Sequence, residues 1–534
     1  MTDTAVLEHP AHPILTATSA VDPLRAQVNA WPDKVATEFN GRKQTYQAFW
    51  KDVEKLGSAL VSGGIGRQHK IAYLGLNSDL YMQLFYACAL TSRLLVPINW
   101  RLAAPEVAYI LKDCEAEILF VDPAFVELAL SVKDDCPALE HIKLIEGTHP
   151  DFETLATWRD RAALVDLSNE AAVGDDVLVQ MYTSGTTGFP KGALLTHQSL
   201  LAAIAKGKLV EEDWSEWDDS DVSLMAMPCF HIGGTAWGFQ SLSNGATCII
   251  LDKPDIPQII RTISEQGITK MFAVPAVLLT ILNDPLSETA NFSSMQEVYY
   301  GASPIPPATL KRALEAFGCS FIQLYGMTEV SGSITYLPPQ DHDVNGAPRM
   351  ASCGKAFPQV DIIIGDDTGK EVAIGDVGEI LIRCDSIMKG YWNREADTKS
   401  AFFGDWYRSG DAGYMDEDGY IYLFDRVKDM IVSGAENIYP AEVEAALMDH
   451  PAVKDVAVIG VPDEKWGEAV KAIVVSGGPL GEAELIAFAK TKIAGYKSPK
   501  SVDFTDELPR NPSGKILKKE LRKPYWPEDG RRVG

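Results

Sequence analysis

The segment from Tyr182 to Gly192 carries the strongest chemical signal in the chain. It reads Tyr-Thr-Ser-Gly-Thr-Thr-Gly-Phe-Pro-Lys-Gly and combines three glycines, four Ser/Thr hydroxyls and one lysine, Lys191. Glycines let the backbone approach a phosphate, N–H groups and hydroxyls bind its oxygens, and the ammonium adds charge. The alternative is a flexible turn, but the density of hydroxyls after an apolar run predicts an anion-binding loop between a strand and a helix. It is not a Walker A loop, because Pro190 and Gly192 stand where that loop requires Gly and Ser or Thr.

Two further segments have side chains suited to a nucleotide. The first is Tyr325-Gly-Met-Thr328-Glu329. Its tyrosine can stack on a base, its threonine can bind a phosphate, and its carboxylate can hold Mg²⁺ that bridges phosphate oxygens. The second is the segment 407–413, in which Asp411 stands between two glycines and could accept hydrogen bonds from both ribose hydroxyls. Each segment taken alone is equally well explained as a surface turn.

Two segments near the C-terminus complete the set. The charged stretch 425–437 lies where the composition of the chain changes, so it is a candidate hinge that carries function. An ordinary charged linker is the favoured explanation when the stretch is taken alone. The last segment is Asn511-Pro-Ser-Gly-Lys515, and a lone lysine in a Gly/Pro turn is usually a solvated surface residue.

The elements that must position these segments follow an alternating pattern. From about Lys70 short apolar runs alternate with helix-like stretches, which predicts βαβ units around a parallel sheet. The expected strands are Ile71–Leu76, Leu94–Ile98, Ile118–Val121, Val177–Tyr182, Met271–Val274, Val298–Tyr300 and Phe321–Tyr325, and the expected helices are Leu80–Thr91, Pro105–Lys112 and Gln198–Lys206. Past Arg426 the pattern favours a small α+β domain of about 100 residues. Ligands of open α/β sheets lie at the carboxyl ends of strands, where the motifs occur.

Composition places limits on the class of protein. The 534 residues exceed one ordinary core, so at least two domains are expected. A net charge of −26 disfavours nucleic acid and anionic lipid as partners. Eight cysteines without a CxxC pair disfavour a zinc site or a disulfide scaffold. The N-terminus lacks the features of a signal peptide. The sequence contains no run of 18 apolar residues of the kind that would predict a membrane span. These features suit a cytoplasmic enzyme.

Taken together and in this order, the five segments are specific. The chain resembles the adenylate-forming superfamily of acyl-CoA and aryl-CoA ligases, nonribosomal peptide adenylation domains and luciferase-like enzymes, from about Phe39 to Arg522. The resemblance implies a large N-terminal α/β domain, residues 1–425, with doubly wound sheets and a small barrel-like β subdomain. It also implies a hinge at 426–428 and a small mobile α+β domain at 429–534.

The resemblance implies roles for individual residues. The expected ATP and AMP contacts are Thr183, Ser184, Gly185, Thr186, Thr187, Lys191, Gly301, Ala302, Ser303, Tyr325, Gly326, Met327, Asp411 and Arg426. The expected catalytic residues are Lys515, Glu329 as the Mg²⁺ ligand, Thr328 at the α-phosphate, and His231. For His231 we favour a gate of the acyl pocket over a catalytic base, because a base would need a nearby partner.

The implied coenzyme A contacts lie in the C-terminal part. They are Gly434, Ala435, Glu436 and Trp466, with Lys428 as the hinge residue. Many relatives have a second glycine where this chain has Ala435. The expected acyl pocket is apolar, with small residues that leave depth, and it consists of Phe230, His231, Gly234, Trp237, Ala276, Gly326, Met327 and Val330. Because no Asp stands at the corresponding wall, an amino acid is a less suitable substrate than a fatty or aromatic acid.

The resemblance implies an AMP-forming carboxylic acid–CoA ligase. ATP and Mg²⁺ would convert the acid to an acyl-adenylate, and rotation about Lys428 would then bring coenzyme A to it. Two alternatives remain open: a free-standing enzyme that loads a carrier protein or stops at the adenylate, and a silent nucleotide-binding regulator. The presence of Lys515 and Glu329 disfavours the silent protein. The expected partners are small molecules only. By analogy with the family, a homodimer is expected.

Overall fold

The computed structural model divides the chain into two compact units. The first unit comprises Met1–Asp361 and Arg383–Ser400, and the second comprises Ile362–Ile382 and Ala401–Gly534. The described residues are 12–183, 190–303, 305, 307–342, 348–426, 429–433, 436–438, 440–463, 466–493, 495–510 and 516–526.

A seven-stranded sheet in the first unit has the order β18-β8-β7-β4-β3-β5-β6. Its strands are β3 (Lys70–Leu74), β4 (Leu94–Ile98), β5 (Ile118–Val121), β6 (His141–Leu144), β7 (Val177–Thr183), β8 (Lys191–Thr196) and β18 (Gly390–Tyr391). The strands from β7 to β6 pair in parallel, and β8 and β18 add antiparallel pairs at one edge. The central strands β3, β4 and β5 are buried throughout and, apart from Lys70 at the start of β3, are apolar, as expected for parallel strands covered on both faces.

A nine-stranded sheet in the same unit has the order β15-β14-β13-β12-β11-β9-β10-β1-β2. Its strands are β1 (Val35–Phe39), β2 (Arg42–Thr45), β9 (Val222–Met225), β10 (Thr247–Ile250), β11 (Lys270–Ala273), β12 (Glu297–Gly301), β13 (Ser320–Met327), β14 (Gly332–Leu337) and β15 (Lys355–Ala356). The strands from β1 to β13 in this order are parallel, and the outer strands β2, β14 and β15 are antiparallel. The carboxyl ends of β12 and β13 therefore meet at one edge of the sheet.

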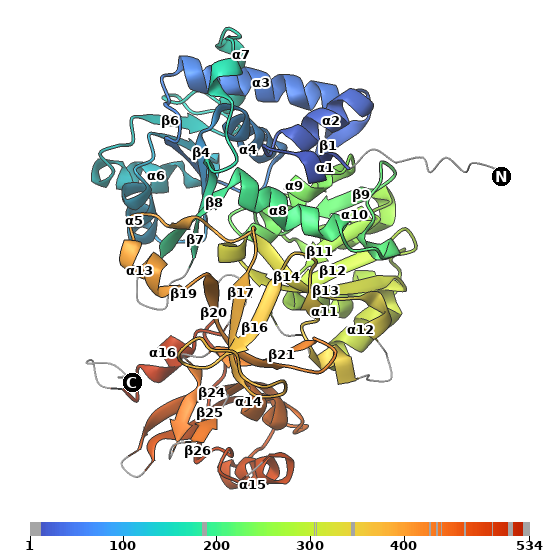
Figure 1. Cartoon of the computed structure of the whole chain (residues 1–534), viewed down its shortest axis with the longest axis vertical. Helices are drawn as coiled ribbons and strands as arrows, with labels where there is room; N and C mark the ends of the chain where they lie inside the picture. The colour runs from blue at the N-terminus through green and yellow to red at the C-terminus, as the bar shows by residue number, and fades with distance from the viewer. Residues whose placement is uncertain are drawn as a thin grey trace, which may run out of the picture. The chain divides into compact units, whose positions relative to one another are not determined.

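Helices connect and cover both sheets (Figure 1). They are α1 (Pro13–Thr16), α2 (Asp22–Ala30), α3 (Tyr46–Ser62), α4 (Asp79–Thr91), α5 (Ala104–Cys114), α6 (Val126–Val132), α7 (Leu155–Arg161), α8 (His197–Lys208), α9 (Ile232–Ser243), α10 (Ile256–Gln266), α11 (Pro275–Asn283), α12 (Pro307–Phe317) and α13 (Glu395–Ser400). Helices α4 and α8 each contact strands of both sheets. Every residue of α4 is buried, which explains why apolar residues predominate around this helix instead of forming one stripe.

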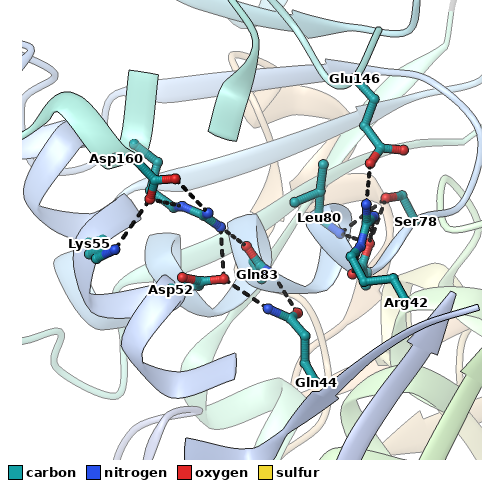
Figure 2. A network of polar contacts seen from close by, with 11 residues as sticks. Arg42, Gln44, Asp52, Lys55, Ser78, Leu80, Gln83, Glu146 and Asp160 are labelled. Carbon is teal, nitrogen blue, oxygen red and sulfur yellow. Dashed lines mark hydrogen bonds and ion pairs between the residues drawn. The ribbon is translucent and has the colours of Figure 1, made fainter. Parts of the chain in front are cut away.

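A ring of polar contacts joins α3, α4, α7 and β2 (Figure 2). Arg159 of α7 donates to Gln83 of α4 over 3.0 Å and lies 2.9 Å from the Asp52 carboxylate of α3. Gln44 of β2 closes the ring, because it accepts from Gln83 over 2.8 Å and donates to Asp52 over 2.8 Å. A recess of about 290 Å³ lies beside the ring. Since these groups bond to one another, we assign the ring a structural role.

The second unit contains two smaller sheets. The first has β16 (Asp361–Gly365), β17 (Gly378–Arg383), β19 (Phe402–Phe403), β20 (Trp406–Met415) and β21 (Ile421–Arg426). The second has β22 (Ile431–Ser433), β23 (Glu436–Ile438), β24 (Val453–Asp463), β25 (Gly467–Ser476) and β26 (Ser501–Phe504), with helices α14 (Pro440–Met448), α15 (Glu482–Lys492) and α16 (Lys518–Arg522). Among the described residues, no helix is long and apolar enough to cross a membrane.

The predicted α/β class is confirmed, and each strand predicted in the first unit matches an observed strand within two residues. One local expectation is wrong. The segment 184–189 joins two antiparallel strands, β7 and β8, and not a strand and a helix. The six residues Lys191–Thr196 extend because β8 pairs with β7 along its whole length, so α8 begins only at His197.

Candidate active site

The hairpin of β7 and β8 brackets the predicted phosphate loop. Thr183 ends β7 and Lys191 begins β8, and the two residues are register partners. Of the predicted loop residues, Ser184, Gly185, Thr186 and Thr187 lie outside the described residues. Gly192 leaves room for the buried Gln180 side chain, because a β-carbon there would come 2.6 Å from the Gln180 amide nitrogen. The hairpin therefore places both described ends of the loop side by side.

Glu329 lies directly beside this hairpin. Its Oε1 atom accepts a hydrogen bond from Thr183 Oγ1 over 3.2 Å and another from the Tyr391 hydroxyl over 3.0 Å. Its carbonyl accepts from the Met388 N–H over 2.8 Å. The short 3-10 helix Thr328–Val330, which follows β13, carries the glutamate. The tertiary structure thus brings the first two motifs, 146 residues apart in the chain, into contact.

Lys191 is held by the segment 390–397. Its ammonium lies 2.6 Å from Asp397 Oδ1 and 5.3 Å from the centre of the Tyr391 ring. Sequence reasoning did not single out Tyr391 or Asp397. A tyrosine after a glycine and an acid in a charged helix are ordinary local features, and nothing local indicates that they meet a lysine 206 residues away from the acid.

The predicted nucleotide wall forms at the carboxyl ends of β12 and β13. Gly301 pairs with Leu324, the residue before Tyr325. A β-carbon on Gly301 would come 2.0 Å from the Leu324 carbonyl oxygen, so only glycine fits. Ala302 has a φ of 66°, and Ala302 and Ser303 are exposed. Two adjacent strand ends therefore present Tyr325 and the predicted wall residues at one edge of the sheet.

The end of β13 is shaped by a bulge and a close backbone contact. The pairing of β13 with β14 shifts register between Tyr325 and Gly326. A β-carbon on Gly326 would lie 1.9 Å from the Gly332 carbonyl oxygen. Met327 and Thr328 follow and are half-buried. This geometry explains why glycine stands between the predicted base-stacking tyrosine and the predicted phosphate contact.

The predicted acyl-pocket residues have different environments. Phe230, Trp237 and Val330 are buried, whereas Ala276 is exposed at the start of α11. Trp237 packs against Trp217 with ring centres 5.2 Å apart. Their membership of one pocket remains a prediction.

Gly234 is small for a packing reason. It lies near the start of α9, and a β-carbon at this position would come 2.3 Å from the Pro228 carbonyl oxygen. The absence of a side chain is therefore needed for the close approach of α9 to the preceding turn.

His231 precedes α9 and is exposed, yet protein surrounds its ring. Desolvation, and to a smaller extent the positive charge of Arg101, together lower the pKa of His231 to about 4. Exposure combined with desolvation is typical of a side chain that lines a recess. At pH 7 the ring is neutral and a weak base, which agrees better with a gate than with a general base.

The predicted ribose pair meets in the second unit. Asp411 of β20 and Arg426 of β21 are register partners in an antiparallel pair. Trp466 is 42% exposed, and its backbone N–H donates to Asp463 Oδ1 over 2.9 Å. The backbone of Glu436 belongs to β23. The remaining predicted residues of this part, Lys428, Gly434, Ala435 and Lys515, lie outside the described residues.

Comparisons with known proteins cover nearly the whole chain. The profile of the AMP-binding enzyme family matches residues 24–392, and that of the AMP-binding enzyme C-terminal domain matches residues 442–515. A fatty acid–acyl-carrier-protein ligase of Streptomyces coeruleorubidus is 36% identical over 94% of this chain and 95% of its own length. An indoleacetate–CoA ligase of Aromatoleum aromaticum is 37% identical over 92% of this chain and 95% of its own length.

A solved structure agrees with the sequence comparisons. The o-succinylbenzoate CoA synthetase of Bacillus subtilis, in complex with its acyl-adenylate intermediate, superposes with a TM-score of 0.81 and 28% identity. The match covers 95% of this chain and 98% of that chain. Together with the family match, this similarity shows that the chain belongs to the AMP-binding enzyme family, in its adenylate-forming group of acyl-CoA and aryl-CoA ligases.

Proposed function

We propose that this protein is an AMP-forming carboxylic acid–CoA ligase that acts on a fatty or aromatic acid. The observation that carries the proposal is the contact of Glu329 with Thr183, beside Lys191. The carboxylate contacts Thr183 at one end of the predicted phosphate loop, and Lys191, at the other end, is the strand partner of Thr183. A hydroxyl and a lysine can bind the oxygens of a triphosphate, and a carboxylate can hold the Mg²⁺ that accompanies it.

The residues around Glu329 fit a magnesium ion. Two hydroxyl donors, Thr183 and Tyr391, occupy Oε1, and no described group bonds to Oε2. No cluster of three or more His, Cys, Asp and Glu side chains exists in the described part of the chain. One carboxylate completed by phosphate oxygens and water is the usual protein site for Mg²⁺. When bound, the ion would neutralise charge that develops on the phosphates.

In the first half-reaction the acid carboxylate attacks the α-phosphate of ATP, the bond from the α-phosphorus to the bridging oxygen breaks, and pyrophosphate leaves as the acyl-adenylate forms. Thr328 would hold the α-phosphate, Lys191 and the loop would hold the outer phosphates, and Asp411 and Arg426 would hold the ribose. Lys515 would stabilise the charge that forms during attack. Because the acyl-adenylate hydrolyses readily, the site must exclude water during this step.

In the second half-reaction the thiol of coenzyme A displaces AMP. We assign this step to a rotation of residues 429–534 about the hinge at 426–428, relative to residues 1–425. Gly434 with Ala435 would let the pantetheine arm pass the backbone, beside Glu436 and Trp466. A lid-type conformational step of this kind would withdraw Lys515 and admit the thiol.

The acid is proposed as fatty or aromatic because the candidate pocket is apolar. Phe230, Trp237 and Val330 are buried apolar side chains. The relatives act on such acids by name, one on a fatty acid and one on indoleacetate. Pocket depth selects chain length, and one residue can block it.

Loading of a carrier protein is the second candidate function. It is favoured by the similarity to a fatty acid–acyl-carrier-protein ligase over 94% of this chain. We propose coenzyme A as the acceptor because two of the similar proteins, the indoleacetate–CoA ligase and the o-succinylbenzoate CoA synthetase, are CoA enzymes by name. The proposal extends to a cytoplasmic location, supported by eight free cysteines of which six are buried. It also includes a homodimer, which size-exclusion chromatography would test.

The test is a product assay by mass spectrometry. Purified protein receives ATP, Mg²⁺ and one acid from a panel of fatty, aryl and amino acids, with coenzyme A, with a holo carrier protein, or with neither. Acyl-CoA with a fatty or aryl acid is the expected product. Acyl-carrier protein without acyl-CoA would establish the second function. A Lys515→Ala variant should lower adenylation about 10²–10³-fold. An absence of AMP with every acid would count against both functions.

A further inference from the structure

The segment 383–400 is an insertion of the first unit between two stretches of the second. It belongs to the first unit, whereas residues 362–382 before it and 401–534 after it belong to the second. The segment is hydrogen-bonded along β8. Gly390 pairs with Leu194, and the backbone N–H of Trp392 donates to the Gly192 carbonyl over 2.8 Å. It therefore lies along the strand that begins with Lys191.

One side chain of this segment, Tyr391, contacts two predicted phosphate-site residues at once. Its hydroxyl donates to Glu329 Oε1 over 3.0 Å, and its ring faces the ammonium of Lys191 at 5.3 Å. The strand β18 that carries it pairs Tyr391 with Ala193 of β8, which fixes the backbone next to the lysine. The position of Tyr391 is thus set by pairing, and its side chain spans the distance between a cation and an anion.

The contacts of Tyr391 have different chemical consequences. The hydroxyl and Thr183 occupy the same carboxylate oxygen of Glu329, which orients the carboxylate and leaves Oε2 without a described partner. The ring attracts the Lys191 ammonium through its negative face. Asp397 holds the same ammonium at 2.6 Å. Long charged side chains lose rotamer freedom when a ligand orders them, so side chains ordered in advance bind it more tightly.

We propose that Tyr391 is a positioning residue that sets Glu329 and Lys191 before ATP·Mg²⁺ arrives. The hydroxyl orients the Glu329 carboxylate and therefore supports the part of ATP binding that depends on Mg²⁺. The ring holds the Lys191 ammonium and therefore supports the part of ATP binding that does not depend on Mg²⁺. This proposal rests on the proposed function, since it assumes that the site takes ATP.

The test is calorimetric titration of ATP, with Mg²⁺ and with EDTA, into the parent protein and into Tyr391→Phe. The substitution removes the hydroxyl and keeps the ring. We expect the ATP·Mg²⁺ affinity to fall about tenfold, since a hydrogen bond to a charged group is lost, while the metal-free affinity stays within about twofold. In steady-state assays the KM for ATP·Mg²⁺ should rise by a similar factor, with a smaller change in kcat. A Tyr391→Leu variant removes the ring too and should weaken metal-free ATP binding.

Tyr422→Phe is the matched control, because that hydroxyl also donates to a carboxylate, Asp416 Oδ2, over 3.2 Å. It should leave both affinities unchanged. An unchanged ATP·Mg²⁺ affinity in Tyr391→Phe would overturn the proposal. An equal fall with and without Mg²⁺ would also overturn it, because it would indicate general disruption. If the parent protein itself binds no ATP, the proposed function fails rather than the role of Tyr391. If Tyr391→Leu does not fold, the Tyr391→Phe comparison decides alone.

Discussion

Replacing Glu329 by glutamine should abolish most adenylation without unfolding the protein. The amide oxygen of Gln can still accept from Thr183 and Tyr391, so both hydroxyls that now meet Oε1 keep an acceptor. The amide nitrogen takes the place of Oε2, which removes the negative charge and a potential metal ligand. Local structure should therefore persist while the electrostatic contribution to catalysis disappears.

The magnitude follows from this geometry. Loss of one preorganised electrostatic group typically lowers rates about 10²–10³-fold, equivalent to about 3–4 kcal/mol. The stability cost should stay below about 1 kcal/mol, since neutral hydrogen bonds replace charge-assisted ones at a half-buried position. Activity and stability should therefore separate clearly for Glu329→Gln.

The assay is ATP–pyrophosphate exchange at saturating acid, combined with urea denaturation. Glu146→Gln is the control, because Glu146 pairs with Arg42 elsewhere in the first unit and is 41% exposed. It should leave the exchange rate unchanged. An exchange rate for Glu329→Gln within about threefold of the parent, with the same Mg²⁺ dependence, would refute the assignment of Glu329. So would a fall in activity that merely follows a loss of folded protein.

Three further predictions concern two buried titratable side chains and one tightly packed glycine. Burial lowers the pKa of His197 to about 4, below an unfolded value near 6.5, so its contribution to stability is present above pH 6.5 and is lost as the pH falls toward 4. In the His197→Asn variant, the loss of unfolding free energy on acidification should be smaller than in the parent by about 3 kcal/mol. Urea denaturation between pH 7.5 and about 4.5 measures this difference. Burial lowers the pKa of Lys206 to about 8, so Lys206→Met should stabilise the protein by about 1–3 kcal/mol at pH 7, and the gain should shrink as the pH rises from about 8 to 10.5. Gly234→Ala should cost about 1–3 kcal/mol, since its β-carbon meets the Pro228 backbone, and the melting temperature should fall.

Each of these predictions has a contrary outcome. If the unfolding free energies of His197→Asn and the parent fell equally as the pH is lowered, the histidine would not be neutral in the folded state. A destabilised Lys206→Met variant would show that the hydrogen bond from Lys206 to Ser386, over 3.2 Å, outweighs the burial of charge. A Gly234→Ala variant as stable as the parent would show that α9 can move away from the preceding turn without cost.

Much of the fold could be predicted from the sequence because the signals are local. Apolar runs such as Leu94–Ile98 and Ile118–Val121 became strands of the same bounds, and Leu80–Thr91 lies within α4. The exception is the stretch after Lys191, which was expected to lead into a helix. It extends as β8 because β7 supplies hydrogen bonds along its length, and neighbouring residues in the chain cannot reveal that partner.

The motifs of the candidate site were also readable from the sequence, because glycines, hydroxyls and charged groups at fixed spacing restrict the chemistry of a loop. Only the tertiary structure decided which of them meet. The contact of Thr183 with Glu329 spans 146 residues, that of Tyr391 with Glu329 spans 62, and that of Lys191 with Asp397 spans 206. Contacts at such separations depend on how β18 pairs with β8 and how α8 packs between two sheets, which is a property of the folded core and not of any segment. For the same physical reason Tyr391 and Asp397 had no recognisable signal in the sequence, although they hold the two charged groups on which the proposed chemistry depends.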